Sequence, residues 1–109
     1  MQENIGIIGL GTVGLALYNQ VKELSDFNIK KVAIKNTEKK RAIPPSLLTE
    51  DAFEIIDDPQ IGIILEAIDD EVAGSAFARQ TLKRGKVYIS ASKKMIANSL
   101  EELKKLERF

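Results

Sequence analysis

The feature that most constrains the fold is a glycine-rich segment that directly follows a short apolar run. Residues 5–8 form this run, which stops at Gly9, the first residue of the sequence Gly-Leu-Gly-Thr-Val-Gly. From Thr12 the apolar residues instead recur at helical spacing, up to about Ser25. A short run that is apolar on both faces is typical of a buried parallel strand. The segment therefore predicts a strand, a glycine turn and a helix, in that order.

The spacing of Gly9, Gly11 and Gly14 is the G-x-G-x-x-G pattern, which predicts dinucleotide binding when it joins a strand to a helix. Gly9 permits the tight turn, Gly11 lets a pyrophosphate approach the backbone, and Gly14 lets the helix pack closely on the strand. The helix start at Thr12 and Val13 presents unpaired N–H groups and a partial positive charge to the phosphates. These five residues are therefore predicted to bind the cofactor.

Strand and helix patterns continue to alternate along the chain. Strands are predicted at residues 29–35, 61–68 and 87–90. Residues 36–45 are polar and end in two prolines, so they are predicted to be a loop. Helices are predicted from Thr49 or Glu50 to about 57–59, from an N-cap at Asp69 to Gly85, over 93–97 as one turn, and over 99–109 with a capping box of Ser99 and Glu102. The alternation predicts an α/β fold, a Rossmann-like doubly wound parallel sheet in three layers (α/β/α), as a single domain over residues 1–109.

The composition excludes several kinds of chemistry. The 109 residues include no Cys and no His, which excludes a zinc site of the usual kind, a Cys nucleophile and a Ser-His-Asp triad within the chain, and no metal is expected. Basic and acidic residues both number 16, and no basic stripe follows a predicted helix, so nucleic acid is not an expected partner. No apolar run approaches the roughly 20 residues of a membrane span, and no basic leader precedes one. We therefore expect a cytoplasmic protein that does not bind membranes.

The end of the second predicted strand bears on the choice between NAD and NADP. NAD-binding domains usually carry an Asp or Glu about 20 residues after the glycines, where it binds the ribose 2′-OH. Lys35 and Asn36 occupy this place, with no carboxylate beside them. A lysine attracts the 2′-phosphate of NADP, whereas a carboxylate repels it. Lys35 and Asn36 are therefore predicted to bind the cofactor, with NADP preferred and NAD as the alternative. Lys39, Lys40 and Arg41 add positive charge, although such a run is more often a solvated loop.

The expected strand order brings a second segment to the cofactor crevice. In a doubly wound sheet the first three strands run outward in order, and the fourth returns to the other side of the first. Ser90, Ala91, Ser92 and Lys93 then face the glycine turn and are predicted to line the site. An ammonium group there can orient a carbonyl substrate or polarise its oxygen, so Lys93 is the candidate catalytic residue. From position alone, a surface lysine at a helix start is an equally good interpretation, and Lys94 is the weaker alternative.

Three segments resemble the cofactor domain of homoserine dehydrogenase. They are residues 7–14 around the glycine turn, residues 32–35, and residues 85–93 with residues 95–97 behind them. In that family the last of these strands is followed by a small residue, an Asn and a Lys, and the Lys lies where the substrate meets the cofactor. Lys93 matches that Lys, so the resemblance implies that Lys93 lies at this junction, after Ala91 and Ser92.

Two positions depart from the family pattern. Ser92 stands where the family usually has Asn, which puts a side-chain amide contact in doubt. The family often has two glycines after the Glu that Glu66 matches, whereas Asp69 and Asp70 stand there in this chain. These two carboxylates either weaken the binding of an anionic ligand or cap the next helix.

The resemblance implies reversible reduction of aspartate semialdehyde to homoserine, with hydride exchange at the nicotinamide. It also implies a downstream substrate and dimerisation domain, so the chain is expected to be the N-terminal part of a longer homodimeric enzyme and to bind cofactor without turnover. The rival enzymes are other amino-acid-pathway reductases, such as aspartate dehydrogenase or one similar to dihydrodipicolinate reductase. A non-catalytic module that senses dinucleotide is the rival of another class. The residues after position 109 would discriminate between these interpretations.

Overall fold

The computed structural model describes residues 3–35, 43–68 and 70–90. Strands and helices alternate through this part of the chain, as the sequence predicts. Their order is β1 (Glu3–Ile8), α1 (Thr12–Val21), β2 (Phe27–Ala33), the 3-10 helix η1 (Pro45–Leu47), β3 (Leu48–Thr49), α2 (Ala52–Ile56), β4 (Ile63–Glu66), α3 (Glu71–Lys83) and β5 (Val87–Ser90).

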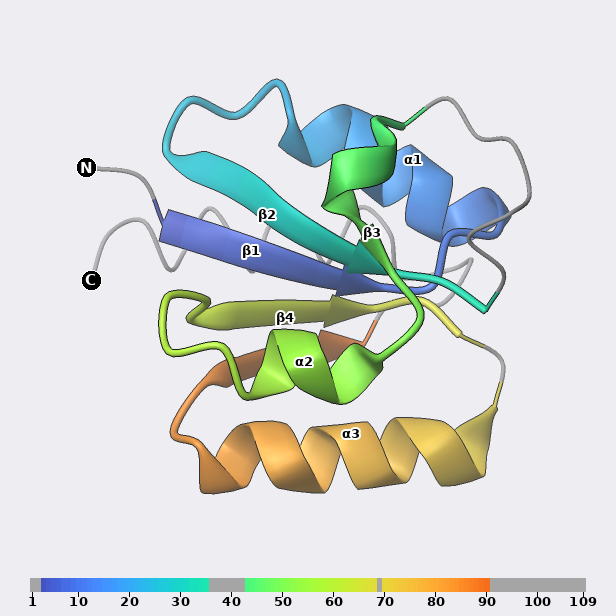
Figure 1. Cartoon of the computed structure of the whole chain (residues 1–109), viewed down its shortest axis with the longest axis vertical. Coiled ribbons are helices and arrows are strands. Elements are labelled where there is room, and N and C mark those ends of the chain that lie inside the picture. The colour runs from blue at the N-terminus through green and yellow to red at the C-terminus, as the bar shows by residue number, and fades with distance from the viewer. Residues whose placement is uncertain (1–2, 36–42, 69, 91–109) are drawn as a thin grey trace.

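The strands form one parallel sheet in the order β3-β2-β1-β4-β5. Helix α1 covers one face of this sheet, and α2 and α3 cover the other (Figure 1). The α1 side is packed by Tyr18 and Val21 against strand residues such as Ile7. The opposite side is packed by Ile55 and Ile56 of α2 against residues that include Ile64. These are the three layers and the doubly wound α/β class that the sequence predicts.

The expected strand order is wrong because one strand was missed. Strand β3 has two residues, too few for a period to show, and it pairs with Val32 and Ala33 of β2. Strand β3 takes the outer position that the sequence pattern predicts for residues 61–68. The strand at Ile63–Glu66 therefore lies on the far side of β1, and β5 pairs with β4 instead of β1. The reversal in strand order falls between β3 and β4.

Several element ends also differ from the sequence prediction. Helix α1 ends at Val21, β2 runs from Phe27 to Ala33, and β4 covers only Ile63–Glu66. Helix α2 is capped by Asp51, which accepts a hydrogen bond from Phe53 N, and not by Thr49 or Glu50. Helix α3 is capped by Asp70, whose Oδ1 accepts from Ala73 N at 3.0 Å.

Several predictions fall outside the described residues. They are the cap at Asp69, the loop over residues 36–42, and the helices at 93–97 and 99–109 with the capping box of the latter. No helix in the described part of the chain is long and apolar enough to cross a membrane.

Candidate functional site

The first glycine of the motif makes the turn out of β1. Gly9 has a φ of 99°, a backbone conformation that side chains disfavour. Its N–H donates to the Ala33 carbonyl at 2.8 Å, which fixes the turn against the end of β2. A Cβ at this position would lie 2.6 Å from the Ala67 carbonyl oxygen and 2.8 Å from Cγ2 of Ile68. Glycine is therefore required here by both conformation and space.

The other two glycines of the motif have opposite surroundings. A Cβ on Gly14 would collide with the carbonyl group of Gly9, so this glycine lets α1 lie directly against the turn. A Cβ on Gly11 would meet nothing within 4 Å. Packing inside the protein therefore explains Gly14 and Gly9 but gives no reason for Gly11. The open space beside Gly11 fits a ligand that approaches the backbone, as a pyrophosphate does in this motif.

The start of α1 carries no side-chain acceptor. Its N-cap is Gly11, no side chain caps the helix, and the first turn contains no acidic residue. The two other described α-helices are each capped by an aspartate, Asp51 and Asp70. The first N–H groups of an α-helix have no partner within the helix, and together with the helix dipole they favour an anion. The amides at the start of α1 are thus suited to a phosphate.

A cavity of about 620 Å³ opens beside the glycine turn. It lies at the carboxyl ends of β1, β2 and β4, the edge at which open α/β sheets bind ligands. Gly9, Gly11 and Lys35 border it, which brings together the predicted turn residues and the predicted 2′-phosphate residue. Its full lining is Ile8, Gly9, Leu10, Gly11, Ala33, Ile34, Lys35, Glu50, Ala52, Ala67, Ile68, Asp70, Ala73 and Phe77.

Among the described residues, the segment after β4 faces the glycine turn, and Ser90 does not. Because β4 is the neighbour of β1, Ala67 and Ile68 lie against Gly9. Ser90 ends β5, two strands away from β1, and borders a second cavity of about 450 Å³. The two cavities adjoin, since Ile68 and Asp70 line both of them.

A buried carboxylate connects the ends of β4 and β5 beside the second cavity. Glu66 is only 6% exposed and accepts hydrogen bonds from Tyr88 Oη at 2.8 Å, Ile68 N at 3.0 Å and Ser90 Oγ at 3.3 Å. Burial, followed by the hydrogen bond to Glu66, raises the pKa of the Tyr88 phenol far above its usual value. The Tyr88 hydroxyl therefore keeps its proton and donates to Glu66. Gly74 of α3 leaves room for the Glu66 carboxylate, because a Cβ on Gly74 would lie 3.0 Å from Glu66 Oε1.

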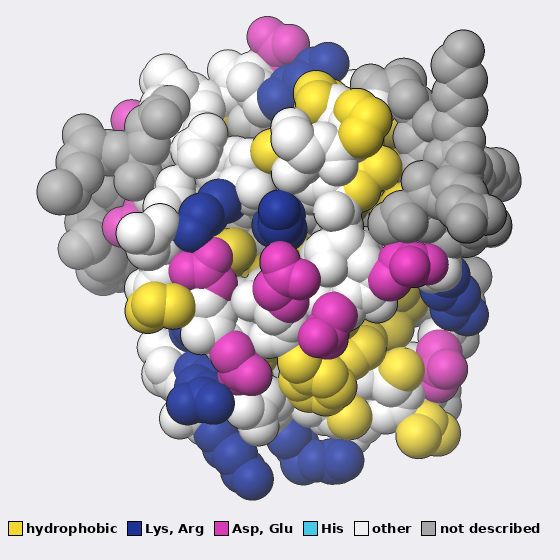
Figure 2. Space-filling view, viewed as in Figure 1, with side chains coloured by type: hydrophobic (Ala, Val, Ile, Leu, Met, Phe, Trp, Pro, Cys, Tyr) yellow, Lys and Arg dark blue, Asp and Glu magenta, His cyan; other side chains and the backbone are white. Residues whose placement is uncertain are grey.

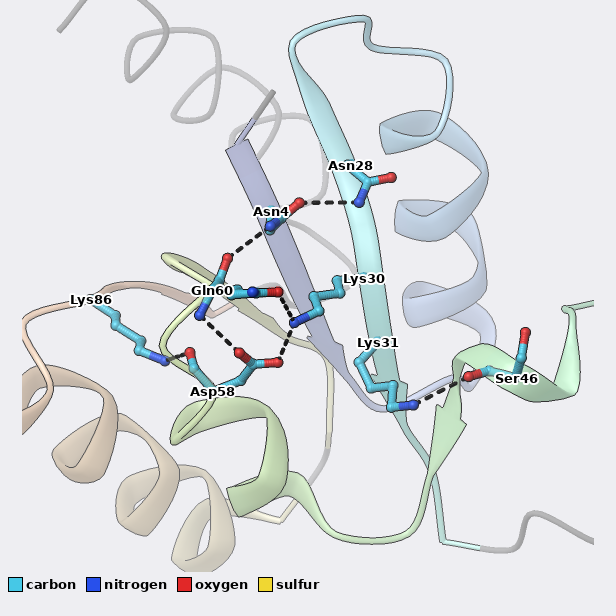
Figure 3. Close-up of polar contacts among 8 residues, drawn as sticks. All are labelled: Asn4, Asn28, Lys30, Lys31, Ser46, Asp58, Gln60 and Lys86. Atoms are coloured by element: carbon cyan, nitrogen blue, oxygen red, sulfur yellow. Dashed lines mark hydrogen bonds and ion pairs between the residues drawn. The ribbon is translucent and has the colours of Figure 1, made fainter. Parts of the chain in front are cut away.

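A second polar network lies near the beginnings of β1 and β4, at the other end of the sheet (Figure 3). Lys30 Nζ donates to Asp58 Oδ2 and to Gln60 Oε1, both at 2.7 Å. Lys86 Nζ donates to the Asp58 carbonyl at 2.5 Å, and Asn4 Nδ2 donates to the Gln60 carbonyl at 2.9 Å. The hydrogen bonds from Lys30 and from Gln60 N lower the pKa of Asp58. These lysines are engaged away from the cavity, so their role is structural.

Some of the predicted site residues border the cavity or begin α1, and others lie outside the described residues. Thr12 is exposed at the start of α1, and Val13, also in its first turn, is half-buried. Asn36, Ala91, Ser92 and Lys93 lie outside the described residues, so their assignments stay predictions. Sequence reasoning missed Ala67, Ile68 and Glu50 as lining residues. The first two were identifiable as the residues that follow a strand, whereas Glu50 depends on the missed strand β3.

Comparison with known proteins gives a consistent result. A family model described as the NAD-binding domain of homoserine dehydrogenase matches residues 9–108. The homoserine dehydrogenase of Bacillus subtilis is 30% identical over 85% of this chain and 24% of its own length. That of Helicobacter pylori is 29% identical over 92% of this chain and 26% of its own length. The chain thus spans about a quarter of the length of these curated relatives.

Solved structures agree with the sequence matches. An S. aureus homoserine dehydrogenase crystallised at pH 7.0 superposes with a TM-score of 0.75 and 32% identity, covering 97% of this chain and 30% of that one. The enzyme from Thiobacillus denitrificans gives a TM-score of 0.73 at 27% identity, covering 94% of this chain and 26% of that one. The Rossmann-like fold is confirmed, and the matching family indicates a nicotinamide dinucleotide as the cofactor.

Proposed function

Because the chain belongs to the family of homoserine dehydrogenase NAD-binding domains, we propose that it binds its nicotinamide dinucleotide with the pyrophosphate at the glycine turn. The observation that carries this proposal is the open space at Gly11, beside a cavity at the carboxyl ends of the strands. No contact inside the described protein explains why this position is glycine. A ligand that needs to approach the backbone does explain it.

In this proposal the backbone amides at Gly11, Thr12 and Val13 hold the phosphate oxygens. Hydrogen bonds to charged groups contribute about 1.5–3 kcal/mol each, and the absence of a side-chain cap on α1 leaves these donors available. Ala67 and Ile68 pack against Gly9 and border the same cavity. The bound cofactor supplies the hydride chemistry, and the protein supplies position and electrostatics.

We propose NADP as the preferred form of the cofactor. Lys35 follows β2 and borders the cavity, where an ammonium group attracts a 2′-phosphate. Calorimetric titration with both dinucleotides tests this preference. A smaller dissociation constant for NADP is expected, and a smaller one for NAD would overturn the assignment. Asn36 belongs to the same predicted contact.

We further propose that this domain serves the interconversion of aspartate semialdehyde and homoserine in a longer enzyme. The relatives that match carry this enzyme's name over about four times the length of this chain. Lys93 is the proposed catalytic residue, orienting the carbonyl oxygen of the substrate, with Ser90, Ala91 and Ser92 beside it. A homodimeric and cytoplasmic enzyme remains the expectation from sequence.

A spectrophotometric assay at 340 nm tests the activity. Homoserine and NADP are mixed with the 109-residue chain and, separately, with a chimera in which this chain replaces the matching part of the Bacillus subtilis relative. The chimera is expected to form NADPH, and the chain alone is expected to bind the cofactor without turnover. A folded chimera that binds NADP but is no more active with intact Lys93 than with Lys93→Ala would contradict the assigned role of that residue.

A further inference from the structure

The missed strand β3 places an acid next to the end of β2. Ala33 pairs with Thr49, and Ile34 N donates to the Thr49 carbonyl at 2.8 Å. Lys35 directly follows Ile34, and Glu50 directly follows Thr49. Neighbouring strands of a sheet lie about 4.8 Å apart. The parallel register that pairs Ala33 with Thr49 places Glu50 beside Ile34, the residue before Lys35, although 15 positions separate Glu50 from Lys35 in the sequence.

Glu50 and Lys35 also share the cavity beside the glycine turn, and both side chains are exposed. Neither forms an ion pair or a side-chain hydrogen bond with another described residue. An exposed ammonium group and an exposed carboxylate therefore border the same cavity, each available to a ligand. No carboxylate stands beside Lys35 in the sequence, but the fold brings one to the same cavity from the residue that follows β3.

Other acidic side chains nearby already have partners within the protein. Asp and Glu side chains gather over α2 across the middle of the face in Figure 2. Asp51 caps α2, and Glu54 accepts a hydrogen bond from the Thr49 hydroxyl at 2.8 Å. Asp70, which also borders the cavity, caps α3. Glu50 is the acidic residue among these four that has no such task.

From this arrangement we propose that Glu50 is a specificity-determining residue for the dinucleotide. Its carboxylate accepts hydrogen bonds from the adenosine ribose hydroxyls of NAD and repels the 2′-phosphate of NADP, while Lys35 acts in the opposite sense. The pair therefore keeps the preference for NADP small. This inference rests on the proposed cofactor site and adds to it a residue that distinguishes the ribose hydroxyl of NAD from the 2′-phosphate of NADP.

Removal of the Glu50 charge should move the two affinities in opposite directions. In water, two unit charges about 6 Å apart interact by less than about 1 kcal/mol. Because the 2′-phosphate carries about two charges, removal of its repulsion by the Glu50 carboxylate should lower the dissociation constant of NADP by about fivefold to tenfold. Loss of the hydrogen bond from the ribose to the charged Glu50 carboxylate should raise the dissociation constant of NAD by about tenfold. The ratio of the NAD to the NADP dissociation constant should thus rise by more than about tenfold in Glu50→Gln.

The test is calorimetric titration of the chain with NAD and NADP, as wild type, Glu50→Gln and Glu50→Ala. Glu23→Gln is the control, because it removes the same charge from an exposed position beyond the end of α1. Circular dichroism verifies that each variant is folded.

A selective rise in the ratio in both Glu50 variants, with none in the control, is the expected result. A ratio within about twofold of wild type, or equal weakening of both ligands, would overturn the role of Glu50 while leaving the cofactor site standing. If wild type binds neither dinucleotide at millimolar concentration, the proposed site itself is wrong and the role of Glu50 falls with it.

Discussion

Gly11→Ala separates the binding role of the glycine turn from its folding role. Gly11 is the N-cap of α1, with φ −75° and ψ −160°, an extended conformation that alanine adopts without strain. A Cβ added there meets nothing within 4 Å, so the substituted protein has space for the methyl group. Any loss of dinucleotide affinity in this variant therefore reports on a ligand and not on damage to the fold.

The expected change in the free energy of unfolding is small because two effects oppose each other. Replacing glycine by alanine restricts the unfolded chain, which stabilises the protein by about 0.4–1 kcal/mol. Alanine is a poorer N-cap than glycine, which costs about 0.5–1 kcal/mol. The net change should stay within about 1 kcal/mol of zero.

The expected change in binding is larger. The methyl group occupies the space through which a pyrophosphate approaches the backbone, so the phosphate is displaced from the amides at the start of α1. Two hydrogen bonds to a charged group, at about 1.5–3 kcal/mol each, amount to roughly 3–6 kcal/mol. At 1.4 kcal/mol per factor of ten, the dissociation constants of NAD and NADP should both rise by at least about a hundredfold.

The assays are urea unfolding, for stability, and calorimetric titration, for affinity. Gly62→Ala is the matched control, since this glycine precedes β4 at the other end of the sheet and a Cβ there makes only an ordinary 3.6 Å contact with Glu3 Oε2. The control should bind like wild type. Affinity of Gly11→Ala within about threefold of wild type, in a folded protein, would refute the reasoning.

Three further predictions concern the fold itself. Gly9→Ala should lower the free energy of unfolding in urea by about 2–5 kcal/mol, the sum of backbone strain at positive φ and contact with the Ala67 carbonyl, and an unchanged midpoint would contradict this. In Tyr18→Phe, the remaining Tyr88 should give no tyrosinate absorbance until the protein unfolds, because burial and Glu66 raise its pKa; a titration near pH 10 in folded protein would count against the buried hydrogen bond. Asp58 has a lowered pKa, so its contribution of about 0.2–1 kcal/mol is present above its usual pKa of 3.8 and is lost as pH falls through the lowered value. Asp58→Asn should accordingly flatten the acid limb of the stability–pH curve, and identical limbs would argue against the ion pair with Lys30.

The glycine turn could be predicted from sequence because everything that defines it is local. Gly9, Gly11 and Gly14 act within a single strand–turn–helix unit, and each position has the surroundings that its spacing implies. The three-layer arrangement followed from the alternation of strands and helices. Lys35 borders the cavity as expected because it lies two residues after β2, whose end faces the site.

The neighbours of the turn could not be predicted, because they depend on strand order. Strand β3 is recognisable only by its pairing with β2, and without it the sheet reverses at the wrong place. Without β3, the sequence predicts Ser90 beside the turn, where the structure has Ala67 and Ile68. For the same reason, it does not predict that Glu50 borders the cavity. Long-range pairing of a two-residue strand leaves no periodic signal in the sequence.

Amide chemical shifts during a dinucleotide titration test the central claim most directly. In ¹H–¹⁵N spectra of the chain titrated with NADP, the amides of Gly11, Thr12 and Val13 should show the largest saturable shifts, since they are the proposed phosphate donors. The amide of Gly62 should remain in place. Saturable binding that leaves the first turn of α1 unshifted, or no binding at millimolar NADP, would contradict the account.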